Sequence, residues 1–167
     1  MVNFSIKTRG IKDAVRDLEN YTDSLRLRTE LFMEQLAEYG VECAKAEIMT
    51  MDAVFTSELV SSIFADRMES SDDCVIFAVR ADSDHAIFVE MGTGIVGAGT
   101  PYPGKLPAVY AQGKTIHQTL DGRYGWYYQT EYGEWYFTEG MVSRPFMYDA
   151  STQMRHEIER IAREVFK

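Results

Sequence analysis

The sequence is poor in the residues that build disulfide frameworks and metal sites. It has only two cysteines and three histidines among 167 residues. Cys43 and Cys74 form no Cys-x-x-Cys pair and have no metal-ligand spacing, so the sequence gives no sign of a disulfide scaffold or a zinc site. Both cysteines lie in apolar stretches, and we therefore expect two buried free thiols in a reducing compartment.

Long hydrophobic runs are also missing. The longest uninterrupted apolar run, residues 75–79, is far too short to span a bilayer. The N-terminus, MVNFSIKTRG, lacks the apolar core of a signal peptide. We therefore expect a protein that is made in a cytoplasm, stays soluble and has no membrane partner.

Positive charge is scarce. With 17 Lys and Arg against 26 Asp and Glu, the formal net charge is −9. Such a surface repels DNA phosphates on average, which argues against a protein that reads DNA sequence. The hydrophobic content of 46% is that of a folded chain, and the length predicts a single domain over residues 1–167.

The first part of the chain, residues 11–51, is predicted to be helical. Ile11, Val15 and Leu18 begin an apolar stripe, and residues 20–24 are expected to break the helix. Beyond this break, five residues step by four and three along one face: Phe32, Leu36, Tyr39, Cys43 and Ala46.

Residues 52–140 have the pattern of short β-strands separated by turns. The stretch DDCVIFAVRAD predicts a strand with both faces partly buried, and residues 126–130 and 135–138 predict a hairpin around Tyr132 and Gly133. A long Pro/Gly loop is expected over residues 92–125. The C-terminal helix is predicted over residues 144–166, with Ser143 as its N-cap. The fold class is therefore α+β, with two helices packed on a small, mostly antiparallel sheet.

A glycine motif precedes the prolines of this loop. Gly92, Gly94 and Gly97 have the GxGxxG spacing, with Gly99 two residues further on. A dinucleotide site needs a helix next, whereas here three prolines follow at positions 101, 103 and 107. We therefore interpret the glycines as sharp turns in an exposed, flexible loop and predict no cofactor. A nucleotide-binding enzyme that uses this loop remains the alternative.

Two further groups could carry chemistry. Asp82, Asp84 and His85 could hold a metal ion, but a solvated turn is the favoured interpretation. Glu90 could be a catalytic acid, but the sequence offers it no obvious second acid or base. A hydrogen-bonding role at the root of the loop is favoured, and no enzymatic activity is predicted.

Acidic residues recur every four positions on the first helix, at Glu30, Glu34, Glu38 and Glu42. Like charges at this spacing cost about 0.2–0.5 kcal/mol per pair. An ordinary solvated face is one interpretation of this acidic ridge. The alternative is a surface that meets a basic partner or lines a channel through which DNA slides.

The predicted hairpin carries more aromatic side chains than it can bury against its own core: Trp126, Tyr127, Tyr128, Trp135, Tyr136 and Phe137. Aromatic residues are enriched where protein surfaces meet, so Trp126 and Trp135 are predicted to be hairpin anchors or contacts. Single-stranded nucleic acid could stack on them, but Lys114 and Arg123 are nearly the only cations nearby.

Several stretches resemble a family of tailed-phage neck proteins. They are HAIFVEMGTGIVGAGTPYP, GWYYQTEYGEWYFTEGMVSRPFMYDAS and the amphipathic C-terminal helix, together with TSELVSSI. The family comprises the gene-product-ten-like tail-completion or minor tail proteins of lambdoid phages. Met91 departs from its pattern, where an aromatic residue is expected.

The resemblance implies a non-enzymatic α+β subunit of the head–tail junction, located in the virion and assembled in the host cytoplasm. It implies a ring of copies between a head-closure protein and a tail terminator, with DNA only as passing cargo. Tail-tube or minor capsid subunits are the alternatives. We expect the loop to be mobile in the free subunit, with Glu90 at its root, and the last helix to be started and docked by Arg144, Pro145 and Phe146.

Overall fold

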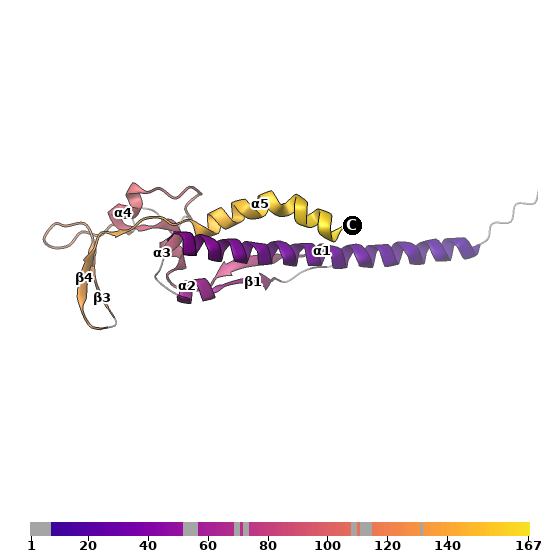
Figure 1. Cartoon of the computed structure of the whole chain (residues 1–167), viewed down its shortest axis with the longest axis horizontal. Coiled ribbons are helices and arrows are strands. Elements are labelled where there is room, and N and C mark those ends of the chain that lie inside the picture. Colours follow the sequence, from indigo (N-terminus) through magenta and orange to yellow (C-terminus); the bar gives the residue numbers. More distant parts are fainter. Residues whose placement is uncertain are drawn as a thin grey trace, which may run out of the picture.

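The structure, a computed structural model, describes residues 8–51, 57–68, 71, 74–107, 110, 115–130 and 132–167. It has the predicted α+β fold, with a long N-terminal helix, a C-terminal helix and antiparallel strand pairs (Figure 1). The elements are α1 (Thr8–Thr50), α2 (Ser57–Ser61), β1 (Ile63–Arg67), β2 (Phe77–Ala81), α3 (Ala86–Met91), α4 (Gly94–Gly99), β3 (Trp126–Gln129), β4 (Trp135–Thr138), β5 (Gly140–Met141) and α5 (Phe146–Val165).

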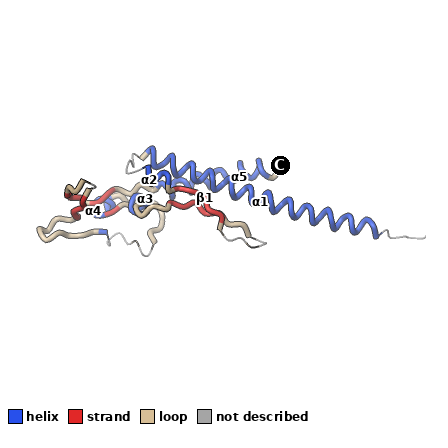
Figure 2. The backbone as a smooth tube through the Cα atoms, turned by 90° about the horizontal axis from the view of Figure 1, so that it is seen from below, coloured by secondary structure: helices blue, strands red, loops and turns tan. Residues whose placement is uncertain are grey.

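The molecule is elongated in both views. Helix α1 has 43 residues, which corresponds to a length of about 65 Å. Its N-terminal half projects alone at one end, and the β3–β4 hairpin lies at the other (Figures 1 and 2). Within the described residues, no helix combines the length and apolar character needed to cross a membrane.

The predicted break at residues 20–24 is wrong, because α1 runs through it without interruption. The hydroxyl of Thr22 donates to the carbonyl oxygen of Leu18 at 2.9 Å, so this polar side chain is bonded within the helix. Residues 11–39 also contain neither glycine nor proline. The Asn, Thr, Asp and Ser residues here have low helix propensity, but the free energy that they cost is too small to end the helix.

Helix α5 packs along the C-terminal half of α1 (Figure 1). Gly40 permits this approach, because a Cβ atom there would lie 2.4 Å from the sulfur of Met154. The predicted apolar face is partly correct, since Leu36 and Cys43 are buried but Ala46 is exposed. Toward its C-terminus α1 is also covered by β1 and β2, so its buried face shifts to Ala44 and Ile48.

Strands β1 and β2 form an antiparallel pair against α1, with Ile63 opposite Ala81 and Arg67 opposite Phe77. Arg67 also forms an ion pair with Glu30 of α1 at 2.8 Å. Strand β2 is shorter than predicted, and Cys74, which precedes it, is exposed. The prediction of a buried thiol is therefore wrong for Cys74 and correct for Cys43.

The antiparallel strands form two separate pairs, β1–β2 and β3–β4, so the predicted sheet is divided. Three short helices, α2, α3 and α4, interrupt the region predicted to be β-rich. The main core is formed where α1, α2, β1, α3 and α5 meet, by Cys43, Ala44, Ile48, Leu59, Ile63, Ala86, Val89, Phe146 and Ala150.

Candidate assembly interface

The candidate interface has a close-packed root and an exposed tip. The root joins α3, α4 and β5 to the start of α5, and the tip is the β3–β4 hairpin. The two are continuous in sequence, because β4 leads within two residues into β5. The root therefore determines where the hairpin is held.

Glu90 is the centre of the root. It is only 6% exposed, and its two carboxylate oxygens accept hydrogen bonds from the backbone N–H groups of Met147 at 2.8 Å and Tyr148 at 3.0 Å. The hydroxyl of Tyr102 donates to the same carboxylate at 3.0 Å. Glu90 thus caps the N-terminus of α5 from a distant part of the chain. The predicted hydrogen-bonding role is confirmed.

The environment of Glu90 perturbs its titration. Burial raises the pKa of Glu90, while the hydrogen bonds from Met147, Tyr148 and Tyr102 act in the opposite direction. Burial, and then the charge of Glu90, also raises the pKa of Tyr102, so the tyrosine hydroxyl remains a donor. These groups therefore act as a structural cap for α5.

Ser143 is not the N-cap of α5. The helix begins at Phe146, with Pro145 at the cap position, and the hydroxyl of Ser143 donates instead to the carbonyl oxygen of Glu90 at 2.8 Å. Arg144 bonds from its backbone N–H to Val89 at 2.9 Å and from its side chain to the Met51 carbonyl at 3.3 Å.

Phe146 is fully buried in the core. The last helix thus begins two residues later than predicted, and Arg144 and Phe146 dock its start. A role of Arg144, Pro145 and Phe146 in assembly stays a prediction.

The glycine motif packs against another segment of backbone. Gly92, Gly94 and Gly97 are buried. Gly94 has a φ of 65°, and a Cβ atom there would lie 2.1 Å from the carbonyl oxygen of Glu139. On the facing strand, Gly140 has a φ of 105°, and its Cβ would lie 2.0 Å from the carbonyl oxygen of Thr93. These residues are glycine because two backbones approach more closely than side chains permit.

The prediction of an exposed, flexible glycine loop is therefore wrong for Gly92, Gly94 and Gly97. Gly99 is exposed, with no atom near the position of a Cβ. The loop prediction missed α4, because the three prolines follow this short helix and do not lie within it. Mobility of the remaining loop before assembly stays a prediction.

The geometry does not form a phosphate cradle. The amide of Gly94 donates to the hydroxyl of Thr115 at 3.2 Å, and the amide of Val96 donates to the carbonyl of Glu139 at 3.4 Å. Helix α4 has only six residues. Amides that already bond within the protein cannot also hold a phosphate, so this conformation does not favour the nucleotide alternative.

Asp82, Asp84 and His85 lie at the turn before α3, and all three are exposed. Across the ranges that the structure describes, no group of three or more His, Cys, Asp and Glu side chains could hold a metal ion. The solvated turn remains the favoured interpretation of this segment.

The hairpin at the tip has aromatic side chains on both faces. Tyr128 lies opposite Tyr136 with ring centroids 6.1 Å apart, and Tyr127 lies opposite Phe137 at 5.2 Å on the other face. Trp135 is 65% exposed. Because successive side chains of a strand alternate between its faces, both surfaces of the hairpin present aromatic rings.

Trp126 differs from Trp135. It is half-buried, and its ring makes an edge-to-face contact with His117 at 5.8 Å. Trp126 is therefore an anchor within the chain, whereas Trp135 is exposed and available as a contact. The sequence alone predicted that each tryptophan is either an anchor or a contact.

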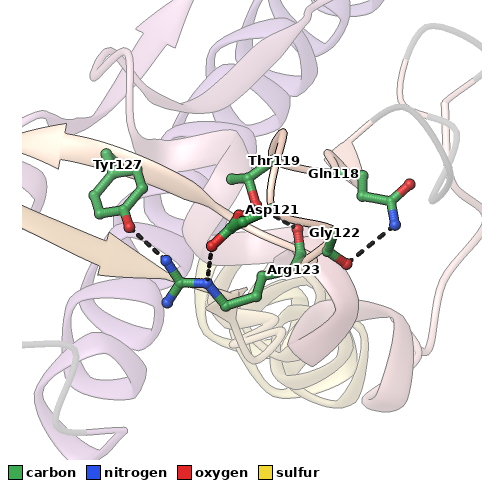
Figure 3. A network of polar contacts seen from close by, with 6 residues as sticks. All are labelled: Gln118, Thr119, Asp121, Gly122, Arg123 and Tyr127. Atoms are coloured by element: carbon green, nitrogen blue, oxygen red, sulfur yellow. Dashed lines mark hydrogen bonds and ion pairs between the residues drawn. The ribbon is translucent and has the colours of Figure 1, made fainter.

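A polar network supports one face of the hairpin (Figure 3). The side chain of Arg123 bonds to Asp121 at 2.7 Å and donates to the hydroxyl of Tyr127. Its guanidinium also lies 4.3 Å from the ring centroid of Phe137, which is a cation–π contact. Hydrogen bonds from Thr119, and then from Arg123, lower the pKa of Asp121.

The charge of Arg123 is thus already partly balanced by Asp121, which weakens the case for nucleic acid stacked on the aromatic rings. Lys114, the other cation considered, lies outside the described residues.

The acidic ridge on α1 is only partly available. Glu30 is half-buried and bonded to Arg67, whereas Glu34, Glu38 and Glu42 are exposed. The structure therefore places three acidic side chains along one exposed row of α1. Both interpretations of this row stay predictions.

Some members of the root carry no recognisable signal in the sequence. The hydroxyl of Tyr110, a buried residue, donates to the carbonyl oxygen of Gly92, and the hydroxyl of Thr93 accepts a bond from the Met141 amide at 3.2 Å. These partners lie 18 and 48 residues apart in the chain. No local pattern of residues could have linked them.

No family model, curated protein or solved structure matches this chain. Its function is therefore inferred from its residues, their packing and the resemblance described above.

Proposed function

We propose that this protein is a structural subunit of the head–tail junction of a long-tailed phage. Copies of it would form a ring that joins the head to the tail, between a head-closure protein and a tail terminator. It would assemble in the host cytoplasm and remain in the virion. The role is mechanical and needs no catalytic group or cofactor.

The observation that carries the proposal is the exposed hairpin on a close-packed root. Trp135, Tyr127 and Tyr136 are each about half exposed or more. A two-stranded hairpin with two exposed aromatic faces is marginal in water and gains stability from a covering surface. Rings are built from such heterologous contacts, in which one surface of a subunit meets a different surface of its neighbour.

The charge of the molecule is compatible with this position. A net charge of −9 and the exposed Glu34, Glu38 and Glu42 give DNA little to adhere to. In the proposed junction, DNA would be passing cargo and would not be bound by sequence. The resemblance of the segments around Glu90 and Arg144 to phage neck proteins supports the same assignment.

The direct test is electron microscopy of lysates from the parent phage or prophage with a stop codon in this gene. We expect DNA-filled heads and separate, complete tails that are not joined, and wild-type protein supplied in trans should restore joined particles. Heads without tails would indicate a tail-tube subunit, and defective heads would indicate a minor capsid subunit. Normal infectious particles would contradict all three structural roles.

A further inference from the structure

The N-terminal half of α1 exposes a row of apolar side chains. Every residue from Ile11 to Arg28 is exposed, and this part of the helix projects beyond α5 (Figure 1). Ile11 is 59% exposed, and Leu18 is 66% exposed. A single helix of this length is marginal in water when its apolar row is uncovered.

The row is a heptad seam, which we define by its members at alternating steps of four and three: Ile11, Val15, Leu18, Thr22, Leu25, Thr29, Phe32 and Leu36. This repeat is the pattern of helices that pair as coiled coils. At its C-terminal end the seam is already paired within the chain, because Phe32 contacts Phe166 with ring centroids 6.1 Å apart and Leu36 is buried. At its N-terminal end the same seam continues uncovered.

The two threonines of the seam are suited to burial. Thr22 and Thr29 donate their hydroxyls to the carbonyl oxygens of Leu18 and Leu25, at 2.9 and 2.8 Å. Their hydroxyl groups therefore lose no hydrogen bond when another helix covers them. Val15, Leu18 and Thr22 also line a shallow surface depression, the kind of hole that a side chain of a facing helix fills.

The charges beside the seam favour a second copy of this chain in the antiparallel direction. Lys12 and Glu19 lie seven residues apart on the same flank of the seam, and both are exposed. When Val15 of one copy faces Leu18 of the other, Lys12 of each copy lies opposite Glu19 of its partner. This register forms two opposite-charge pairs.

Other registers are less favourable. An antiparallel shift by one heptad places Glu19 opposite Glu19, which is repulsive. A parallel alignment places Ala14 opposite Glu19 and Tyr21 opposite Arg26, so it forms no opposite-charge pair at these positions. Of these three arrangements, only the antiparallel one with Val15 opposite Leu18 pairs opposite charges at these flanking positions.

The length of the uncovered seam fits the same register. The side chain of Arg28 bonds to the carbonyl oxygen of Lys167 at 2.8 Å, which places the end of the α5 segment at this level of α1. In the selected register the partner's α1 begins, at Thr8, opposite Leu25. It thus stops about one helical turn short of Lys167.

We infer that this protein forms an antiparallel dimer through residues 8–25 of α1, in the register that places Val15 opposite Leu18. The contact is isologous, so each copy uses the same surface and the pair closes on itself. It is separate from the ring contacts proposed above. Loss of the dimer would therefore leave the proposed function unaffected.

The first test is analytical ultracentrifugation of the purified full chain over a range of concentrations, with Leu18→Asp and Leu27→Asp. The two leucines are about equally exposed, at 66% and 68%, and they are nine positions apart in the chain, so they lie on opposite faces of α1. We expect a concentration-dependent dimer whose Kd rises about a hundredfold in Leu18→Asp, because each dimer loses two buried leucines. Leu27→Asp should have little effect.

The second test is a charge exchange. Lys12→Glu and Glu19→Lys should each raise the Kd about tenfold by converting two attractions into two repulsions. The double variant should restore the wild-type Kd. A monomer at every soluble concentration would overturn the dimer, equal effects of the two leucine variants would overturn the seam, and an unrestored double variant would overturn the register.

Discussion

The two antiparallel strand pairs of this molecule have similar lengths, but one is packed against a helix and the other is largely exposed. In β1–β2, Ile63 is 1% exposed and the pair lies against α1. In β3–β4, Trp135 is 65% exposed, and aromatic rings occupy both faces. The same backbone pairing therefore serves as core in one place and as exposed surface in the other, and what covers the strands makes the difference.

The two pairs are held in place in different ways. The β1–β2 pair is stabilised by apolar burial against a helix. The β3–β4 pair depends on cross-strand aromatic contacts, on Arg123 and on the close-packed root formed by Gly94 and Gly140. Substitutions in the first pair should therefore affect stability, and those at the tip of the second should affect assembly.

The largest expected effect is on the buried pair. Ile63→Ala should lower the free energy of unfolding by about 2–5 kcal/mol, since it leaves a cavity in the core. Chemical denaturation monitored by circular dichroism measures this change. Ile76→Ala is the control, because Ile76 lies beside β2 but is 44% exposed, and its loss should cost clearly less. Equal losses would show that burial against α1 does not make Ile63 more important for stability than Ile76.

The next effect concerns the root of the exposed pair. Gly94→Ala should destabilise the protein by about 2–4 kcal/mol, through its left-handed φ and the clash with Glu139. Gly99→Ala, in the same helix with open space around it, should change the stability by less than about 1 kcal/mol. Thermal unfolding of both variants checks this. A Gly94→Ala protein as stable as wild type would restore the flexible-loop interpretation.

A smaller, pH-dependent effect is expected at Glu90. Glu90→Gln should destabilise the protein by about 1–3 kcal/mol at acidic pH, because the amide cannot accept from all its present donors. Burial raises the pKa of Glu90 in the folded state. The stability that Glu90 contributes is therefore fully present below its unfolded pKa of about 4.3, and it is lost as the pH rises through its folded pKa. The stability difference between wild type and variant should therefore shrink with rising pH.

Denaturation curves of wild type and Glu90→Gln across this pH range measure the difference. Glu139→Gln is a suitable control, because it makes the same change at an exposed side chain. A difference that grows with pH would mean that the hydrogen bonds outweigh burial at Glu90.

The smallest effect on stability is expected at the tip. Trp135→Ala should change the free energy of unfolding by no more than about 0.5 kcal/mol, because the side chain is mostly exposed. In complementation of the stop-codon phage, however, the same variant should yield fewer joined particles. Full joining with this variant would show that Trp135 is not part of the interface, and a large loss of stability would show that it belongs to the core.

Local patterns in the sequence determined much of the architecture. The apolar spacing in α1 and α5 and the aromatic runs around Gly133 predicted two helices and a hairpin in their correct places. These signals succeed because a helix repeats every three to four residues and a tight hairpin pairs near neighbours. Surplus aromatic residues likewise predicted that the hairpin would not be fully buried.

Only the tertiary structure decided the role of the root. Gly94 lies against the backbone of Glu139, 45 residues further along the chain. Glu90 accepts a hydrogen bond from Met147, which is 57 residues further along. A glycine in a flexible turn and a glycine under a close backbone contact are identical in sequence, as are a solvated glutamate and one that caps a distant helix. Local propensity contains no information on which segments meet, so these roles were determined by packing between segments far apart in the chain.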